Sequence, residues 1–153
     1  LPFLFGSYVG PEASGGFVGL RGHHTKEHML RALYEGVAFA TKVHIDRLAR
    51  FRELPETARV SGGAAKSRVW MQMFADVLRK RIEITENDEL GTLGAALCAG
   101  VSVGEFGSFE EGTREMVRIK HVFEPDDDKS EIYAKKFKKY KDTVEAMKRV
   151  WFA

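Results

Sequence analysis

The sequence predicts an α/β fold that is rich in helix and has a short sheet. Residues 58–63 are expected to form a short strand that leads into a turn of two glycines, and residues 67–80 have the pattern of a helix. Residues 81–86 alternate like a strand, and residues 90–104 form a helix of small residues. Strands that alternate with helices in this order favour parallel pairing. The chain ends in an amphipathic helix, residues 129–152.

Apolar residues mark one face of this final helix. They repeat at intervals of three and four positions, which is the spacing of one helical stripe: Tyr133, Phe137, Tyr140, Val144, Met147 and Trp151. The three acids Asp126–Asp128 precede the helix. We expect them to form a solvated turn and to place negative charge at the start of the helix, where it is stabilising.

The segment before the first glycine turn is predicted as a loop followed by a long helix. Residues 1–25 are rich in glycine and aromatic residues, with a strand expected at Phe17–Leu20. A helix is expected over residues 26–53, with Thr25 as its N-cap and His28 in the capping-box position. Gly36 interrupts this helix, either for close packing or as a kink.

Two shorter elements are expected between the small-residue helix and the final one. A short helix follows Ser108, which is a favourable N-cap residue. Residues 117–123 are expected to be extended.

The composition describes an ordinary globular protein and excludes several function classes. The length of 153 residues suits one domain with one core. A balance of 24 basic against 22 acidic residues gives no indication of nucleic acid or of an acidic membrane. The single cysteine, Cys98, lies in an apolar run and is expected to be a buried, reduced thiol of a cytoplasmic protein. The chain begins with Leu1 rather than Met, and we interpret it as part of a longer protein.

The stretch "SGGAAKS", residues 61–67, has the composition of an anion-binding turn. It joins a strand to a helix, where backbone N–H groups and the positive helix end favour an anion. Glycine permits close approach of backbone and ligand. The stretch matches neither GxGxxG nor the Walker pattern, which requires a glycine directly before the lysine. By itself it is more typical of a tight turn that needs small residues for packing.

Four segments of the chain together resemble the FGGY family of carbohydrate kinases. Residues 62–78 resemble its nucleotide-binding segment, residues 15–35 its C-terminal signature, residues 89–106 its glycine–alanine helix, and residues 123–147 its closing helix. The nucleotide-binding match consists of eight positions: Gly62, Gly63, Ala64, Ser67, Trp70, Gln72, Ala75 and Asp76. The four segments occur in the family's order.

The resemblance implies a fold, a ligand and a division of labour. The family has two actin-like, ribonuclease-H-like domains, and residues 1–153 correspond to part of the C-terminal, nucleotide-binding domain. The resemblance implies ATP and Mg²⁺ as cofactors, with Gly63 and Ala64 as the first nucleotide contacts, then Gly62, and with Ser67 near the base. To these we add Lys66, whose charge has the reach to contact a phosphate, although a solvated lysine is an equal alternative. The sugar-binding domain with the catalytic base is expected to lie outside this chain.

No residue of this chain is predicted to be a catalytic base or a metal ligand. Asp76 lies within the helix after the turn and is interpreted as structural. The pair His23–His24 has no third ligand at suitable spacing. His28 is expected to form structural hydrogen bonds, and Glu89 to cap the glycine–alanine helix or to pack near the turn.

Two departures from the family pattern bear on the fold and on the substrate. Where relatives have Leu-Gly-x-Pro after the nucleotide helix, this chain has Leu78–Arg81, so we expect that helix to end without a left-handed glycine cap. The Gly-Glu-Arg of many xylulose kinases is replaced by Gly6–Tyr8, and the stretch Phe3–Ser7 is more similar to the L-xylulose branch.

The leading hypothesis is the nucleotide-binding part of an ATP-dependent kinase for a pentulose such as xylulose or L-xylulose, inactive as a fragment. Its partners would be ATP or ADP and the sugar, with no nucleic acid and no membrane. Two alternatives stay open: a nucleotide-binding module without catalysis, and a structural or interaction domain that uses the final helix. A homodimer is compatible with the sequence, which does not determine the oligomeric state.

Overall fold

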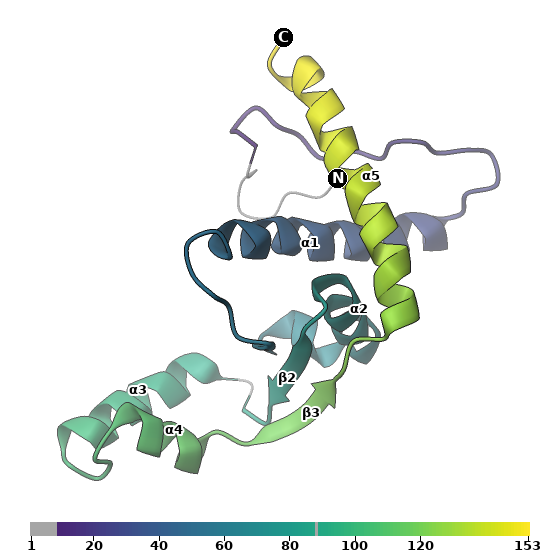
Figure 1. The fold of residues 1–153 in the computed structure, drawn as a ribbon. Helices are drawn as coiled ribbons and strands as arrows, with labels where there is room; N and C mark the ends of the chain where they lie inside the picture. Colours follow the sequence, from purple (N-terminus) through teal and green to yellow (C-terminus); the bar gives the residue numbers. More distant parts are fainter. Residues whose placement is uncertain (1–8, 88) are drawn as a thin grey trace. The chain divides into compact units, whose positions relative to one another are not determined.

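The computed structural model describes residues 9–87 and 89–153. It contains five α-helices, one 3₁₀ helix and three strands in the order α1 (Lys26–Leu48), β1 (Thr57–Val60), η1 (Gly63–Lys66), α2 (Arg68–Leu78), β2 (Arg81–Thr85), α3 (Leu90–Ser102), α4 (Phe109–Met116), β3 (Ile119–Phe123) and α5 (Asp127–Trp151). The α/β expectation is confirmed (Figure 1). The expected single core is not observed, because the chain divides into two compact units.

Helices α1 and α5 belong to the first unit, whose described part is residues 9–55, 76–79 and 125–153, and they cross one another in Figure 1. Phe39 of α1 is buried among aromatic rings of α5, with ring centroids 5.8 Å from Phe137 and 5.5 Å from Tyr140. Tyr133 and Val144 are buried on the same face of α5. The predicted stripe is therefore the face that α5 buries, and it becomes more exposed toward Trp151.

The ends of α1 follow from local hydrogen bonds. The backbone N–H of Thr25 donates to Nδ1 of His28 at 3.2 Å, so the histidine takes the place of the capping-box acid as expected. The helix ends at Leu48 rather than at residue 53. The N–H groups of Arg50 and Phe51 bond carbonyls three residues back, which tightens the final turn and stops the helix.

The strand expected at Phe17–Leu20 is wrong. These residues form no strand in the described part of the chain. Phe17, Val18 and Leu20 are all exposed. A strand needs a neighbour to satisfy its backbone groups, and the three strands that the structure describes pair only with one another, as β1-β2-β3.

The second unit, residues 56–75 and 80–124, is built on a mixed three-stranded sheet. Strands β1 and β2 are parallel, as predicted, with Val60 opposite Ile84, whereas β2 and β3 are antiparallel. Ile82 and Ile84 of β2 are buried, and so are Met71, Phe74 and Ala75 of α2 in the same unit. The alternation predicted for residues 81–86 therefore reflects one buried face of β2.

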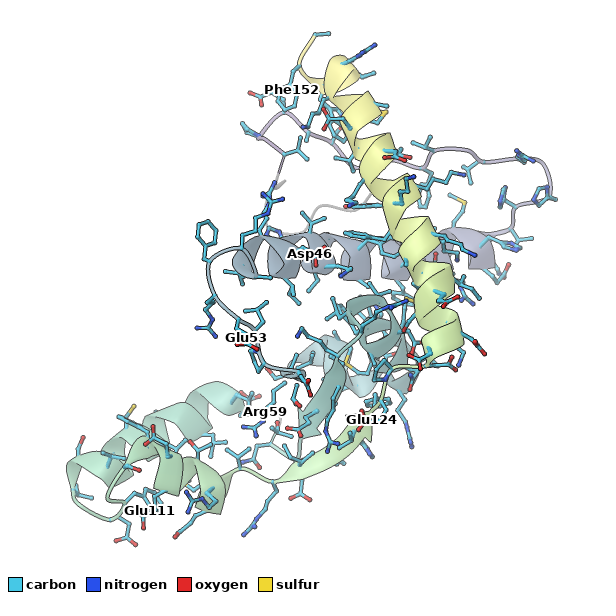
Figure 2. All side chains as sticks on the ribbon, viewed as in Figure 1. Asp46, Glu53, Arg59, Glu111, Glu124 and Phe152 are labelled. Carbon is cyan, nitrogen blue, oxygen red and sulfur yellow. The ribbon has the colours of Figure 1, made fainter. Side chains whose placement is uncertain are left out.

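An ion network crosses the exposed part of this sheet. Glu83 of β2 accepts from Arg59 Nε at 3.1 Å and from Arg81 Nε at 3.3 Å. Arg81 also pairs with Glu124 at 2.8 Å, so the network joins all three strands or their ends. Arg59 and Glu124 are labelled in Figure 2. Such exposed pairs define the register more than they stabilise it.

Helix α3 differs from the expectation that it is buried. All its residues are described, and none of them is buried. Cys98 is exposed, so the predicted buried thiol is wrong. The small residues of α3 cover little area themselves, and its neighbour α4 contributes only a short face, where Gly112 is buried. The apolar pattern therefore predicted the helix correctly but not its burial.

Helices α2, α4 and α5 end or begin at specific caps. Ser108 accepts a hydrogen bond from the N–H of Glu111 and caps α4, as predicted. Asp126 accepts from the N–H of Lys129 and caps α5, which therefore begins two residues before the predicted start. Helix α2 ends in a left-handed residue, but that residue is Arg79, with φ 52°, rather than glycine. The helix therefore ends without a glycine cap, as expected, but the left-handed conformation at its end is still present, at Arg79.

Candidate functional site

The predicted nucleotide turn lies directly after β1. Gly62 has φ +85° and ψ −170°, a left-handed backbone that a residue with a Cβ rarely adopts. A Cβ placed on Gly62 or on Gly63 meets no atom within 4 Å. The backbone of both residues is therefore accessible to a ligand. Gly62 is needed for its conformation, whereas the structure of the chain alone sets no requirement for glycine at position 63.

The turn continues through η1 into the cap of α2. The N–H of Ala65 bonds the carbonyl of Gly62 at 3.0 Å, and Ala64 and Ala65 are half-buried. Oγ of Ser67 accepts from the N–H of Trp70 at 3.3 Å, which makes Ser67 the N-cap of α2. Lys66 is exposed at the end of η1. The predicted contacts Gly62, Gly63, Ala64, Lys66 and Ser67 thus form one continuous turn, and Ser67 has a structural task besides any ligand contact.

A groove lies at the end of the neighbouring strand. Strands β1 and β2 are parallel and in register, so the chain leaves both at one edge of the sheet. The groove after β2 has a volume of about 480 Å³. It is lined by Glu86, Asn87, Glu89, Thr92, Leu93 and Ala96. In open sheets with parallel strands, ligands bind at the carboxyl ends of the strands. The sequence did not single out Asn87 or Thr92; Thr92 lies within the segment of residues 89–106 but was not named as a site residue.

Glu89 occupies the N-cap position of α3 but does not cap it with its side chain. The expected side-chain cap is therefore wrong. The carbonyl of Glu89 accepts the N–H of Leu93 at 3.1 Å, which is the ordinary first bond of a helix. The side chain lines the groove after β2 instead.

Two polar side chains of α2, those of Gln72 and Asp76, form hydrogen bonds with backbone groups of this chain. Nε2 of Gln72 donates to the carbonyl of Glu124 at 2.8 Å. Oδ1 of Asp76, whose residue is only 2% exposed, accepts from the N–H of Asp126 at 3.0 Å. A buried carboxylate that bonds a backbone N–H is a structural arrangement. The interpretation of Asp76 as structural is thus supported by its geometry.

The acids at the start of α5 also act locally. Lys129 contacts the Asp126 carboxylate at 2.9 Å through its ammonium group, and its backbone N–H donates to the same carboxylate. These bonds lower the pKa of Asp126.

The histidines near the start of α1 form local hydrogen bonds. Nδ1 of His28 accepts from the N–H of Thr25, and the N–H of Arg21 donates to Nδ1 of His24 at 2.8 Å. Across residues 9–87 and 89–153, no three His, Cys, Asp or Glu side chains are arranged to hold a metal ion.

Comparison with known proteins identifies the family. Residues 2–103 match the model of the FGGY family of carbohydrate kinases, C-terminal domain. This chain belongs to the FGGY family. The chain is 42% identical over 148 residues to the L-xylulose/3-keto-L-gulonate kinase of Escherichia coli K12, covering 96% of this chain and 30% of that protein.

Solved FGGY kinases share the fold of the chain. A ligand-bound xylulose kinase from Lactobacillus acidophilus superposes with a TM-score of 0.86 at 26% identity, over 93% of this chain and 29% of the kinase. The glycerol kinase of Plasmodium falciparum with ADP superposes with a TM-score of 0.72 at 30% identity, over 84% of this chain and 26% of the kinase. The chain therefore spans less than a third of the length of these FGGY proteins.

In the part of the chain that the structure describes, no helix combines the length and the apolarity needed to cross a membrane. The substrate-related stretches Phe3–Ser7 and Gly6–Tyr8 lie outside the described residues.

Proposed function

We propose that this chain supplies the nucleotide-binding turn of an ATP-dependent carbohydrate kinase. The observation on which the proposal rests is the turn at Gly62–Gly63: it follows a parallel strand, its backbone is open to a ligand, and it belongs to an FGGY chain. The structure of the Plasmodium glycerol kinase with ADP supports a nucleotide as the ligand. The proposed contacts are Gly62, Gly63, Ala64, Lys66 and Ser67.

The residues of this chain would bind and orient the phosphate donor. The two glycines allow the nucleotide to approach the backbone closely, because neither glycine has a side chain that would separate the ligand from the backbone. The charge of Lys66 would attract a phosphate. Ser67 keeps α2 capped while its exposed neighbours contact the ligand. Phosphoryl transfer depends chiefly on such positioning and on charge stabilisation.

Among the described residues, no three His, Cys, Asp or Glu side chains are grouped to hold a metal ion. Mg²⁺, when bound, neutralises charge on the transferred phosphoryl group. We expect it to enter with the phosphates of ATP, and not through a carboxylate cluster of this chain. The general base that accepts the proton of the sugar hydroxyl would belong to the sugar-binding domain, which forms part of the proposed complete kinase.

A pentulose is the proposed substrate, with L-xylulose or xylulose as the first choices. The Escherichia coli and Lactobacillus acidophilus proteins named for these sugars support the choice. The Plasmodium glycerol kinase shows that a closely similar domain also occurs beside a different substrate. We propose a cytoplasmic location because ATP and free sugars meet there. We propose separately that the complete kinase is a homodimer, and its mass in solution tests this.

The proposal is tested in the complete kinase by comparing Gly63→Ala with Gly22→Ala. At both positions a Cβ meets nothing within 4 Å, so neither substitution disturbs the chain by contact. We expect Gly63→Ala to raise the KM for ATP about tenfold or more, because the methyl group occupies the space of the ligand, and to leave the KM for the sugar unchanged. Gly22→Ala should change neither constant. Equal KM values for ATP in both variants would refute the proposed contact.

The same assay separates the enzyme from a module that binds nucleotide without catalysis. The enzyme forms ADP only when the sugar is present. A non-catalytic module would bind ATP, lose affinity in Gly63→Ala and form no sugar phosphate. An interaction domain would show no response to nucleotide in either variant.

A further inference from the structure

A second groove lies in the helical unit, between the C-terminal half of α1 and the middle of α5. We call it the basic groove. Its volume is about 420 Å³. Four basic side chains, Arg47, Arg50, Lys141 and Lys148, line it together with the acids Asp46 and Glu145. This volume is within the range of small-molecule sites. None of its residues belongs to the nucleotide turn.

The acids of the basic groove are already neutralised by nearby lysines. Asp46 pairs with Lys42 at 3.0 Å, and Glu145 pairs with Lys148 at 2.6 Å. In the part of the chain that the structure describes, Arg50 and Lys141 have no ion pair with a carboxylate. Arg50 lies in the turn directly after α1 and Lys141 lies on α5, so positive charge faces the groove from two segments. An anion in the groove would receive charge-assisted hydrogen bonds from both.

The basic groove also has an apolar floor. Phe137 and Val144 line it and are themselves buried, with 6% and 5% of their surface exposed. The ammonium group of Lys141 lies 5.0 Å from the centroid of the Phe137 ring, which holds this cation against the floor. Apolar side chains with a few convergent polar groups are typical of small-molecule sites. The combination fits a ligand with an anionic head and an apolar body.

We propose that the basic groove binds a small organic anion. Its phosphate or carboxylate head contacts Arg50 and Lys141, and its apolar body lies on Phe137 and Val144. The inference does not depend on the nucleotide turn, because it uses only residues of the helical unit. The site gives the protein a second place at which a metabolite of this chemistry binds.

The test titrates the full chain with phenyl phosphate, benzoate, inorganic phosphate and phenol, and follows amide chemical shifts and heat of binding. Phenyl phosphate or benzoate should shift the amides of residues 43–50 and 137–148, and the stronger of the two identifies the preferred head group. Inorganic phosphate and phenol should each bind about fivefold more weakly or worse, because each lacks one half of the ligand. Failure of both phenyl phosphate and benzoate to shift these amides would overturn the proposal.

A pair of double variants separates the site from general charge attraction. Arg50→Gln with Lys141→Gln should weaken binding of the better probe about tenfold. Lys135→Gln with Lys138→Gln removes the same charge from exposed positions of α5 outside the groove and should leave the affinity within about twofold. Equal losses in both double variants would overturn the proposal. Melting curves establish that both variants are folded, and the amide shifts of the unchanged chain decide the question if either is not.

Discussion

The carboxylate of Asp76 accepts a hydrogen bond from the backbone N–H of Asp126 at 3.0 Å, across 50 positions of sequence. Asp76 is 2% exposed, so this bond is shielded from water. The same Asp126 uses its own side chain to cap α5. One buried acid of the α2 motif therefore fixes the residue from which the final helix begins.

Replacing Asp76 with alanine should destabilise the chain by about 1–3 kcal/mol, because the N–H of Asp126 loses a shielded acceptor. Asp76→Asn keeps a carbonyl acceptor and should cost less. Urea denaturation measures both values. Asp142→Ala, at an exposed position of α5, is the matched control and should change stability by no more than about 0.5 kcal/mol. A loss no greater for Asp76→Ala than for the control would contradict the structural role.

Arg79→Gly should stabilise the chain by about 1 kcal/mol. Arg79 has φ 52°, which costs energy for any residue with a Cβ and none for glycine. The N–H of Lys80 bonds the carbonyl of Ala75 at 3.3 Å, which is the hydrogen bond of a left-handed helix end. Arg79→Ala keeps the Cβ and should have little effect. A melting temperature that rises equally in both variants would show that the strain is not the cause.

The two glycines of the nucleotide turn should respond differently to alanine when no ligand is present. Gly62→Ala should cost about 1–2 kcal/mol, because φ +85° is strained for alanine although there is space for the methyl group. Gly63→Ala should be close to neutral, since its backbone is not left-handed and the space is open. Thermal unfolding without nucleotide measures both. Equal destabilisation would mean that crowding, not backbone conformation, decides the response.

Glu35 should couple energetically to Lys136. Its carboxylate lies 2.8 Å and 3.0 Å from Nζ of Lys136, and Nε of Arg31 lies 2.9 Å from one of the same oxygens. A double-mutant cycle with Glu35→Gln and Lys136→Met should give about 1 kcal/mol, because the lysine side chain is 44% exposed and the pair is partly screened.

The contact between Lys26 and Glu27 supplies the reference for that cycle. Its atoms are 3.8 Å apart and its side chains are 92% and 68% exposed. Its coupling energy should be near zero. If the two cycles gave the same coupling, burial of Glu35 would have no influence on the strength of its ion pair.

Tyr133 should make stability fall at alkaline pH. Burial raises the pKa of its phenol, the carboxylate of Glu35 raises it further, and the hydrogen bond from Arg31 acts in the opposite direction. The folded pKa therefore lies above the unfolded one. Its contribution is fully present below the unfolded pKa of about 10 and is lost as the pH rises toward the folded value.

Tyr133→Phe removes this titration, so the stability of the unchanged chain should fall relative to the variant between about pH 9 and 11. Urea midpoints measured across this range give the comparison. Tyr34→Phe, at an exposed position of α1, provides the background for loss of a phenol. A constant difference between the unchanged chain and Tyr133→Phe would rule out the titration as the cause.

Local patterns determined most of the helices and strands. The stripe of α5, the alternation of β2 and the caps at Thr25 and Ser108 depend on residues close in sequence, so the sequence predicts each of them. The turn at Gly62–Ser67 was found in the same way, from two glycines placed between a strand and a helix. What this turn binds required the whole set of FGGY motifs, because a short glycine turn has no unique ligand.

Tertiary structure decided burial and the side-chain environments. The small-residue pattern predicted α3, but the exposure of Cys98 depends on what packs against that helix. The role of Asp76 required a partner 50 positions away, and the basic groove required α1 and α5 to meet. Sequence by itself determined the elements and the candidate turn because hydrogen bonds and periodicity within an element are local. Only the tertiary structure decided which charges meet and which apolar faces are covered, because those contacts join residues distant in the chain.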